Sequence, residues 1–195
     1  MTEEEAAQKK AALRQRIKYQ RDSLTEAYRR AASQAAAAQF AKYVDCAGKV
    51  VALFVPIGSE IDGASLFKTV IAQGGRAALP VVLGEEPMAF LAWDGNLETL
   101  IKGLFGTRFP NDRHVVHPDI IVVPLLGFDR RGHRLGWGKG YYDRTIAAMP
   151  KRPRTVGLAF AMQEVGMVAS EAHDIPLDLI ITEKGPVRVT NKDHH

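Results

Sequence analysis

The sequence has only one cysteine among its 195 residues, Cys46, and no cluster of cysteine and histidine residues. An internal disulfide needs two cysteines, and zinc or iron–sulfur sites need grouped thiolate or imidazole ligands. The sequence therefore predicts none of these. A chain that depends on no disulfide is typical of a reducing compartment, and we expect a cytoplasmic location.

Long apolar segments are also missing. No hydrophobic run approaches the roughly 20 residues that a membrane-spanning helix needs. The first five residues, Met-Thr-Glu-Glu-Glu, are acidic, whereas a secretory signal begins with basic and then apolar residues. We therefore expect neither a membrane partner nor export.

The composition is that of a globular protein, with 46% hydrophobic and 25% charged residues. A chain of this length can bury a sizeable core as one domain, which we place over 1–195. We expect N-terminal helices at about 3–43 and an α/β core at about 49–185. The net charge of +4 is compatible with anionic ligands. The basic residues form no single tract or RNA-binding motif, so we expect no nucleic-acid partner, and we expect a monomer.

Two helices are predicted at the amino terminus, at about 3–21 and 23–43. Thr2 and Glu5 have the spacing of a capping box at the start of the first. In the second, residues recur at a helical period, which predicts a face packed closely against a neighbour. These residues are Tyr28, Ala31, Ala35 and Ala38.

Strands and helices alternate along the rest of the chain. Predicted strands lie at 49–55, 76–82, 87–93, 119–124, 155–161 and 179–182, and predicted helices at 62–73 and 141–149. This alternation predicts a three-layer α/β fold, with a largely parallel sheet and helices on both faces. Ligands of such sheets bind beyond the carboxyl ends of the strands. Three segments should lie there: the first loop (56–62), the glycine loop (127–140) and the third loop (162–178).

The glycine loop has the composition of a phosphate-binding segment. Its glycines are Gly127, Gly132, Gly136, Gly138 and Gly140. Glycines leave backbone amides free to point at one anion, and the helix that follows directs its N–H groups to the same place. Lys139 and Arg134 add positive charge. The spacing matches neither a Walker A loop nor a dinucleotide fingerprint. The alternative is a flexible crossover, but structureless loops of this length are usually functional, so phosphate binding is the favoured interpretation.

The first turn of the predicted helix after this loop contains Asp143. A carboxylate at that position either favours the helix dipole or serves as a Mg²⁺ ligand, and the spacing does not decide between the two. Tyr142 lies on the apolar stripe with Ile146 and Met149, which predicts a core residue. Tyr141 is freer to face a ligand.

The stretch from Asp119 to Arg144, DIIVVPLLGFDRRGHRLGWGKGYYDR, resembles the signature of the 5-formyltetrahydrofolate cyclo-ligases. The resemblance extends over nearly the whole chain, from about Lys10 to Thr182. It includes the amino-terminal motif Lys10-x-x-Leu-Arg14, the motif Pro56-x-x-x-Glu60-Ile-Asp62, the motif Gly157-x-Ala-Phe160-x-x-Gln163 and the pair His173-Asp174.

The resemblance implies the function. It implies a three-layer, CoA-transferase-like α/β fold, with ATP and 5-formyltetrahydrofolate as substrates and Mg²⁺ as the required ion. The ATP-binding residues that it implies are Lys10, Arg14, Arg134, Leu135, Gly136, Trp137, Gly138, Lys139, Gly140, Tyr141 and Tyr142. It places Val55, Glu60 and Tyr141 at the folate and Asp143 and Asp174 at the metal. Lys139, Arg134 and Glu60 are the expected catalytic residues.

Without the resemblance, several of these residues have ordinary structural interpretations. Lys10 and Arg14 would form a solvated basic face, and Glu60 an acidic position ahead of a helix. His173 is more readily a surface residue than a proton shuttle. The chain also departs from the family at 105–110, where the motif Gly-Ile-Pro-Glu-Pro is often found, and at Trp137, where many members have arginine.

Other functions remain open at this point. A related protein that binds phosphorylated ligands, such as a sugar-phosphate isomerase, would need no nucleotide. A nucleic-acid-binding module is disfavoured by the scattered basic residues. An inactive member of the same family would have an intact loop, and only an assay would distinguish it.

Overall fold

The computed structural model describes residues 3–85, 87–169 and 174–187. Its helices are α1 (Glu3–Asp22), α2 (Glu26–Tyr43), α3 (Phe67–Ala72) and α4 (Tyr141–Ala148), with short 3-10 turns at Ala64–Leu66, Leu104–Gly106 and Ala161–Gln163. Its strands are β1 (Val50–Ala52), β2 (Arg76–Val81), β3 (Ala89–Trp93), β4 (Leu100–Lys102), β5 (Arg108–Pro110), β6 (Val115–Val116), β7 (Ile120–Pro124), β8 (Gly127–Phe128), β9 (Arg134–Leu135), β10 (Arg154–Leu158), β11 (Leu179–Thr182) and β12 (Gly185–Val187).

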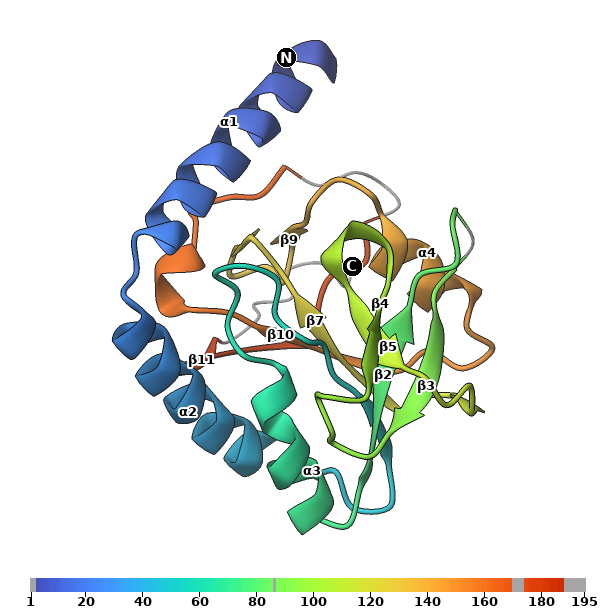
Figure 1. The fold of residues 1–195 in the computed structure, drawn as a ribbon. Helices are drawn as coiled ribbons and strands as arrows, with labels where there is room; N and C mark the ends of the chain where they lie inside the picture. Colours follow the sequence, from blue (N-terminus) through green and yellow to red (C-terminus); the bar gives the residue numbers. More distant parts are fainter. Residues whose placement is uncertain (1–2, 86, 170–173, 188–195) are drawn as a thin grey trace, which may run out of the picture.

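Eight strands form the central sheet, in the order β12-β11-β10-β7-β1-β2-β3-β6 (Figure 1). The five strands from β11 to β2 are parallel to their neighbours, and β12, β3 and β6 join antiparallel at the two edges. The hairpins β4–β5 and β8–β9 lie outside this sheet. The prediction of a largely parallel sheet is confirmed. The carboxyl ends of the parallel strands all lie at one edge of the sheet.

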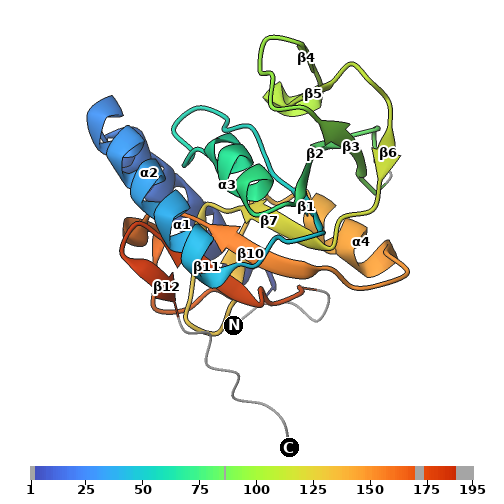
Figure 2. The same cartoon turned by 90° about the horizontal axis from the view of Figure 1, so that it is seen from below.

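Helices cover both faces of the sheet, so the three-layer prediction is also confirmed (Figure 2). Neighbouring residues of β1 point to opposite faces, as a pleated strand requires. Val51 joins a core cluster with Phe40 of α2 and Val70 of α3. Val50 joins a second cluster with Ile146 of α4. We call these faces the α2 side and the α4 side.

The packed face of α2 differs from the prediction. The buried residues are Ala32, Ser33, Ala36 and Phe40, whereas the predicted stripe is exposed. That stripe comprises Tyr28, Ala31, Ala35 and Ala38. Phe40 is completely buried and has the largest apolar surface on this part of the helix, so its burial determines which face turns inward. Burial of the alanine stripe would contribute less free energy, so the orientation of the helix is set by Phe40.

The strands that were predicted correspond to β1, β2, β3, β7, β10 and β11, several of them shorter than expected. The strands that were not predicted, β4, β5, β6, β8, β9 and β12, have only two or three residues and therefore show no period. The predicted helix at 62–73 opens with the 3-10 turn before α3. Thr2 of the predicted capping box lies outside the described residues. Within the described ranges, no helix combines the length and apolarity required to cross a bilayer.

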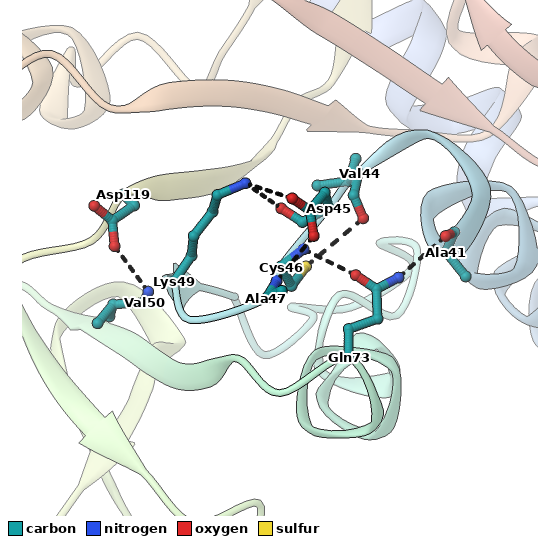
Figure 3. Close-up of polar contacts among 9 residues, drawn as sticks. All are labelled: Ala41, Val44, Asp45, Cys46, Ala47, Lys49, Val50, Gln73 and Asp119. Carbon is teal, nitrogen blue, oxygen red and sulfur yellow. Dashed lines mark hydrogen bonds and ion pairs between the residues drawn. The ribbon is translucent and has the colours of Figure 1, made fainter.

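Side chains hold the connection from α2 to β1 at the opposite, amino-terminal edge of the parallel strands (Figure 3). Gln73, at the end of α3, donates to the Ala41 carbonyl at 3.1 Å and accepts from the Cys46 amide at 2.8 Å. Asp119 accepts from the Val50 amide at 2.9 Å. These contacts fix the start of β1 between β2 and β7, and so fix where the first loop leaves the sheet.

Candidate functional site

The three predicted loops meet at the carboxyl edge of the sheet. Trp137 of the glycine loop donates its indole N–H to Glu60 of the first loop, with the two atoms 3.4 Å apart. Arg134, at the start of β9, donates to the carbonyl of Ile175 in the third loop at 2.7 Å. The prediction that these loops lie together at one edge of the sheet is therefore confirmed by their contacts.

The glycine loop is more ordered than a simple crossover. Its first half is the hairpin β8–β9, and only residues 136–140 connect that hairpin to α4. Gly138 and Gly140 have positive φ angles of 87° and 64°, a conformation that glycine adopts without strain. Gly140 is the N-cap of α4, so the free N–H groups of the first helical turn lie at the end of the connection. This arrangement suits a phosphate chain.

Helix α1 contributes to the same loop. Arg14 donates its Nε–H to the carbonyl of Gly136 at 2.9 Å. Lys10 is half-buried and lies one turn earlier on the same face of α1. The structure thus excludes the solvated basic face for Arg14 and brings the amino-terminal motif to the glycine loop.

Lys139 and Tyr141 lie beside an aromatic residue that the sequence did not single out. The Lys139 ammonium is 4.9 Å from the centre of the Phe105 ring, and the Phe105 and Tyr141 rings are 6.0 Å apart. Phe105 is 56% exposed and has a positive φ of 57°. The Tyr141 hydroxyl donates to the carbonyl of Gly84 at 2.8 Å. The β4–β5 turn, one of the departures from the family, therefore forms a wall of the site.

A buried arginine from α1 also enters the site, and the sequence interpretation missed it. Arg21 is only 2% exposed, and its Nε donates to the Ser59 hydroxyl at 3.0 Å. Its guanidinium carbon is 5.8 Å from the centre of the Trp137 ring. A signal was available, because Arg14, Ile17 and Arg21 follow a helical period, and residues at that period share one face.

The Glu60 carboxylate is buried among these groups. Burial raises its pKa, while hydrogen bonds from the Ile57 amide and Trp137 and the positive charge of Arg21 act in the opposite direction. Burial in turn lowers the pKa of Arg21, and Glu60 and Asp22 oppose that shift. Each of these two buried charges therefore partly offsets the cost of burying the other.

The backbone beside Asp174, one of the two predicted metal ligands, lies against the carboxylate of the other, Asp143. Asp143 accepts from Arg134 at 2.7 Å and from the Ile175 amide at 3.0 Å, both on its Oδ1 atom. Asp174 directly precedes Ile175, so the third loop brings its backbone to Asp143. The Oδ2 atom of Asp143 accepts no hydrogen bond from the described residues.

This donor set fits Mg²⁺, which takes one or two carboxylates and completes its shell with phosphate oxygens and water. The described residues contain no group of three or more histidine, cysteine, aspartate or glutamate side chains placed to hold a metal. A metal held by protein groups alone is therefore not supported there. Arg134 is committed to Asp143 and Ile175, which makes it a support of the carboxylate in this structure.

The other predicted site residues differ in how far they are buried in the core. Tyr142 packs against the core on the α4 side with Ile146 and Met149, as predicted, and its burial raises its pKa. Leu135 is buried against α1, so only its backbone can reach a ligand. Val55 is half-buried directly before the first loop. His173 lies outside the described residues.

Two buried polar side chains hold the glycine loop, the segment before it and the third loop by hydrogen bonds. Gln163 donates to the carbonyls of Leu125 and Leu126 at 2.8 and 2.9 Å. Asp129 is completely buried and accepts hydrogen bonds from the amides of Arg131 and Val168. Burial alone would raise the pKa of Asp129, but these amides and the Arg131 guanidinium outweigh it and hold the pKa below its ordinary value.

The chain is similar to known proteins of one family. Residues 6–183 match the model of the 5-formyltetrahydrofolate cyclo-ligase family. The 5-formyltetrahydrofolate cyclo-ligase of Escherichia coli (strain K12) is 30% identical, over 85% of this chain and 96% of its own. The NMR structure of the Aquifex aeolicus 5,10-methenyltetrahydrofolate synthetase is 31% identical, covers 95% of both chains and has a TM-score of 0.78. A 5,10-methenyltetrahydrofolate synthetase from Mycoplasma pneumoniae is 25% identical, with 89% and 98% coverage and a TM-score of 0.72.

Proposed function

The chain belongs to the 5-formyltetrahydrofolate cyclo-ligase family, and on this premise we propose that it converts 5-formyltetrahydrofolate to 5,10-methenyltetrahydrofolate. The conversion consumes ATP and releases ADP and phosphate. The observation that supports the proposal is the contact between Trp137 of the glycine loop and Glu60 of the first loop. The loop that we assign to the phosphates of ATP thereby lies directly beside a buried carboxylate.

The reaction requires the γ-phosphate of ATP and the formyl group of the folate to lie in one site. A formamide carbonyl is a poor electrophile, since the N5 lone pair is delocalised into it. Transfer of the γ-phosphoryl group of ATP to the formyl oxygen turns that oxygen into a leaving group. N10 then attacks the formyl carbon and loses its proton, the carbon–oxygen bond breaks, and phosphate leaves. For such a transfer the protein mainly positions the reactants and neutralises charge.

On the nucleotide side, we assign the phosphates to the backbone of the glycine loop and the start of α4. The residues proposed to form the ATP site, through backbone or side chain, are Lys10, Arg14, Arg134, Leu135, Gly136, Trp137, Gly138, Lys139, Gly140, Tyr141 and Tyr142. Among their side chains, the Lys139 ammonium is the cation best placed to follow the transferred phosphoryl group, because it is exposed and rests on an aromatic ring. Arg134 acts through its ion pair with Asp143.

Mg²⁺ would be held by Asp143 and Asp174 together with phosphate oxygens and water. When bound, it supplies positive charge that neutralises the β- and γ-phosphates. The chain itself orients Asp143, because Arg134 and the Ile175 amide both donate to its Oδ1 atom. The Oδ2 atom would then be the oxygen that binds the metal.

On the folate side, we assign the pterin to Glu60, with Val55 and Tyr141 beside it. A carboxylate accepts two hydrogen bonds from the adjacent N–H donors of a pterin ring, and burial strengthens such bonds. Glu60 would then fix the orientation of N5 and N10 relative to the glycine loop. We further propose that residues 1–195 act as one domain and as a cytoplasmic monomer, and light scattering would test the monomeric state.

The direct test is incubation of the purified protein with ATP, Mg²⁺ and 5-formyltetrahydrofolate while the absorbance of the methenyl product is followed. The product should appear, and omission of ATP or chelation of the metal should abolish it. No product under complete conditions would overturn the proposal. Binding of a phosphorylated sugar without any nucleotide effect would favour the isomerase-like alternative.

A further inference from the structure

Arg21 is an unusual residue for α1, because its long cationic side chain is 2% exposed. A buried guanidinium is unfavourable unless its charge and N–H groups find partners. Its Nε donates to the Ser59 hydroxyl at 3.0 Å, and that hydroxyl in turn donates to Asp22 through a short hydrogen bond. Ser59 immediately precedes Glu60 in the first loop.

The same guanidinium meets the glycine loop. It lies 5.8 Å from the centre of the Trp137 ring, within the range of a cation–π interaction. The Trp137 indole N–H is the group that donates to Oε1 of Glu60, and the Ile57 amide donates to Oε2 at 2.9 Å. Arg21 therefore touches the residue before Glu60 in the chain and the side chain that donates to it.

We propose that Arg21 is a positioning residue for the folate: through Ser59 and Trp137 it holds the Glu60 carboxylate in the orientation that receives the pterin. This inference rests on the proposed function. It explains how this chain works with tryptophan at 137, since the indole offers a face to Arg21 and an N–H to Glu60 at once. It also links α1, the first loop and the glycine loop at one carboxylate.

The charge of Arg21 has a second effect on the same group. It opposes the effect of burial on the Glu60 carboxyl and favours its ionised form. An ionised carboxylate accepts hydrogen bonds on both oxygens, whereas the protonated form must donate one. Loss of Arg21 should therefore weaken folate binding through both the orientation and the charge of Glu60.

The experiment compares Arg21→Met, Arg21→Lys and Ser59→Ala with a matched control, Arg16→Met, which removes an exposed arginine from the same helix. Steady-state kinetics give KM for 5-formyltetrahydrofolate and kcat, and calorimetry gives the dissociation constant of ADP. Thermal unfolding reports the stability of each variant.

We expect Arg21→Met to raise the folate KM about tenfold or more, with a smaller change in kcat and an unchanged ADP dissociation constant. ADP binding should persist because Arg14, on the same helix, still contacts the glycine loop. Arg21→Lys should recover part of the loss, since it restores the charge without the planar group. Ser59→Ala should raise the folate KM in the same direction, and Arg16→Met should match the wild type.

Two results would overturn the inference. One is an unchanged folate KM in Arg21→Met and Ser59→Ala. The other is an equal loss of ADP and folate affinity that follows the fall in stability, which would show that Arg21 only docks α1. If Arg21→Met does not fold, Arg21→Lys and Ser59→Ala decide by the same criteria. A wild-type protein that forms no methenyl product would instead refute the proposed function.

Discussion

Arg14 and Gly136 are 122 positions apart in the chain and are joined by a hydrogen bond of 2.9 Å from the Arg14 Nε to the Gly136 carbonyl. The bond orients the rest of the guanidinium toward the glycine loop, where its Nη2 atom lies 3.5 Å from the position that a Cβ atom on Gly138 would occupy. The loop is thus shaped by α1 as well as by its own glycines.

Gly138→Ala tests this shape. Gly138 has a φ of 87°, so an alanine there adopts a strained conformation that costs about 1–2 kcal/mol. We expect a loss of stability of this size in urea denaturation and a higher KM for ATP. Gly136→Ala is the stability control, because its φ lies outside the strained range and its Cβ would meet no atom within 4 Å. Equal stabilities for both variants would contradict the left-handed backbone conformation of Gly138.

Lys139→Ala tests the proposed phosphoryl-transfer role. The ammonium is exposed and contacts the Phe105 ring, so its removal should have little effect on thermal stability. Removal of one charge-stabilising donor typically lowers kcat by about 10²–10³-fold, and we expect a loss of that order in the methenyl absorbance assay. Lys151→Ala, at another exposed lysine, should behave as the wild type. Normal turnover by Lys139→Ala would exclude the assignment.

The sequence predicted the parts of this molecule that depend on local patterns. The continuous apolar run at β7 and the helical stripe of α4 are each visible within one short segment, and both elements were placed correctly. Contacts between distant segments leave no such period. The pairing of Arg21 with Ser59 and the packing of Phe105 against Tyr141 depend on how α1 and the β4–β5 turn are placed, and tertiary packing alone determines them.

The same limit applies to Arg134. Its position in a glycine loop beside Lys139 indicated a second cation for the phosphates, because sequence shows charge but not partners. In the structure its charge is paired with Asp143. The partners of Arg134 are a carboxylate nine residues away and a carbonyl of the third loop, and neither pairing is visible in the spacing of the sequence.

Glu60 should make folate binding sensitive to mild acid. Burial raises the pKa of this carboxyl, against the opposing effects of the Ile57 amide, Arg21 and Trp137. Protonation therefore begins at a higher pH than for an ordinary glutamate, and the folate KM should rise as the pH falls through that range. Glu60→Gln should have a high folate KM that hardly changes with pH. A wild-type profile as flat as that of the variant would show that Glu60 does not bind the substrate in its ionised form.

The ion pair of Arg134 and Asp143 should stabilise the site. Its side chains are only 8% and 19% exposed, and loss of one partner from a buried pair typically costs about 3–5 kcal/mol. Arg134→Met and Asp143→Asn should each lower the free energy of unfolding, and the double variant should lose less than the sum. Glu26→Gln breaks the exposed pair with Arg30 and should change stability by less than about 0.5 kcal/mol. Strict additivity of the buried pair would contradict the pairing.

Asp129→Asn tests the support behind the glycine loop. Asp129 accepts hydrogen bonds from the amides of Arg131, His133 and Val168, and from the Arg131 guanidinium at 2.8 Å. An amide side chain replaces one accepting oxygen with a donor, so that a buried N–H group faces other N–H groups. We expect a loss of about 2–3 kcal/mol at neutral pH by urea denaturation. Asp112→Asn, at an exposed loop position, should have no comparable effect.

The pH dependence of that loss identifies its cause. The pKa of Asp129 is lower in the folded protein than its ordinary value, because hydrogen bonds to the carboxylate outweigh burial. The folded state therefore binds this proton less readily than the unfolded chain. The stabilisation is complete above the ordinary pKa of an aspartate, about 3.9, and is lost as the pH falls through the lowered value. Because the amide of the Asp129→Asn variant cannot titrate, the stability difference between wild type and variant should shrink as the pH falls below about 4. A difference that stays constant from neutral to acid pH would mean that the charge of Asp129 contributes nothing, and that shape alone holds the hairpin against the third loop.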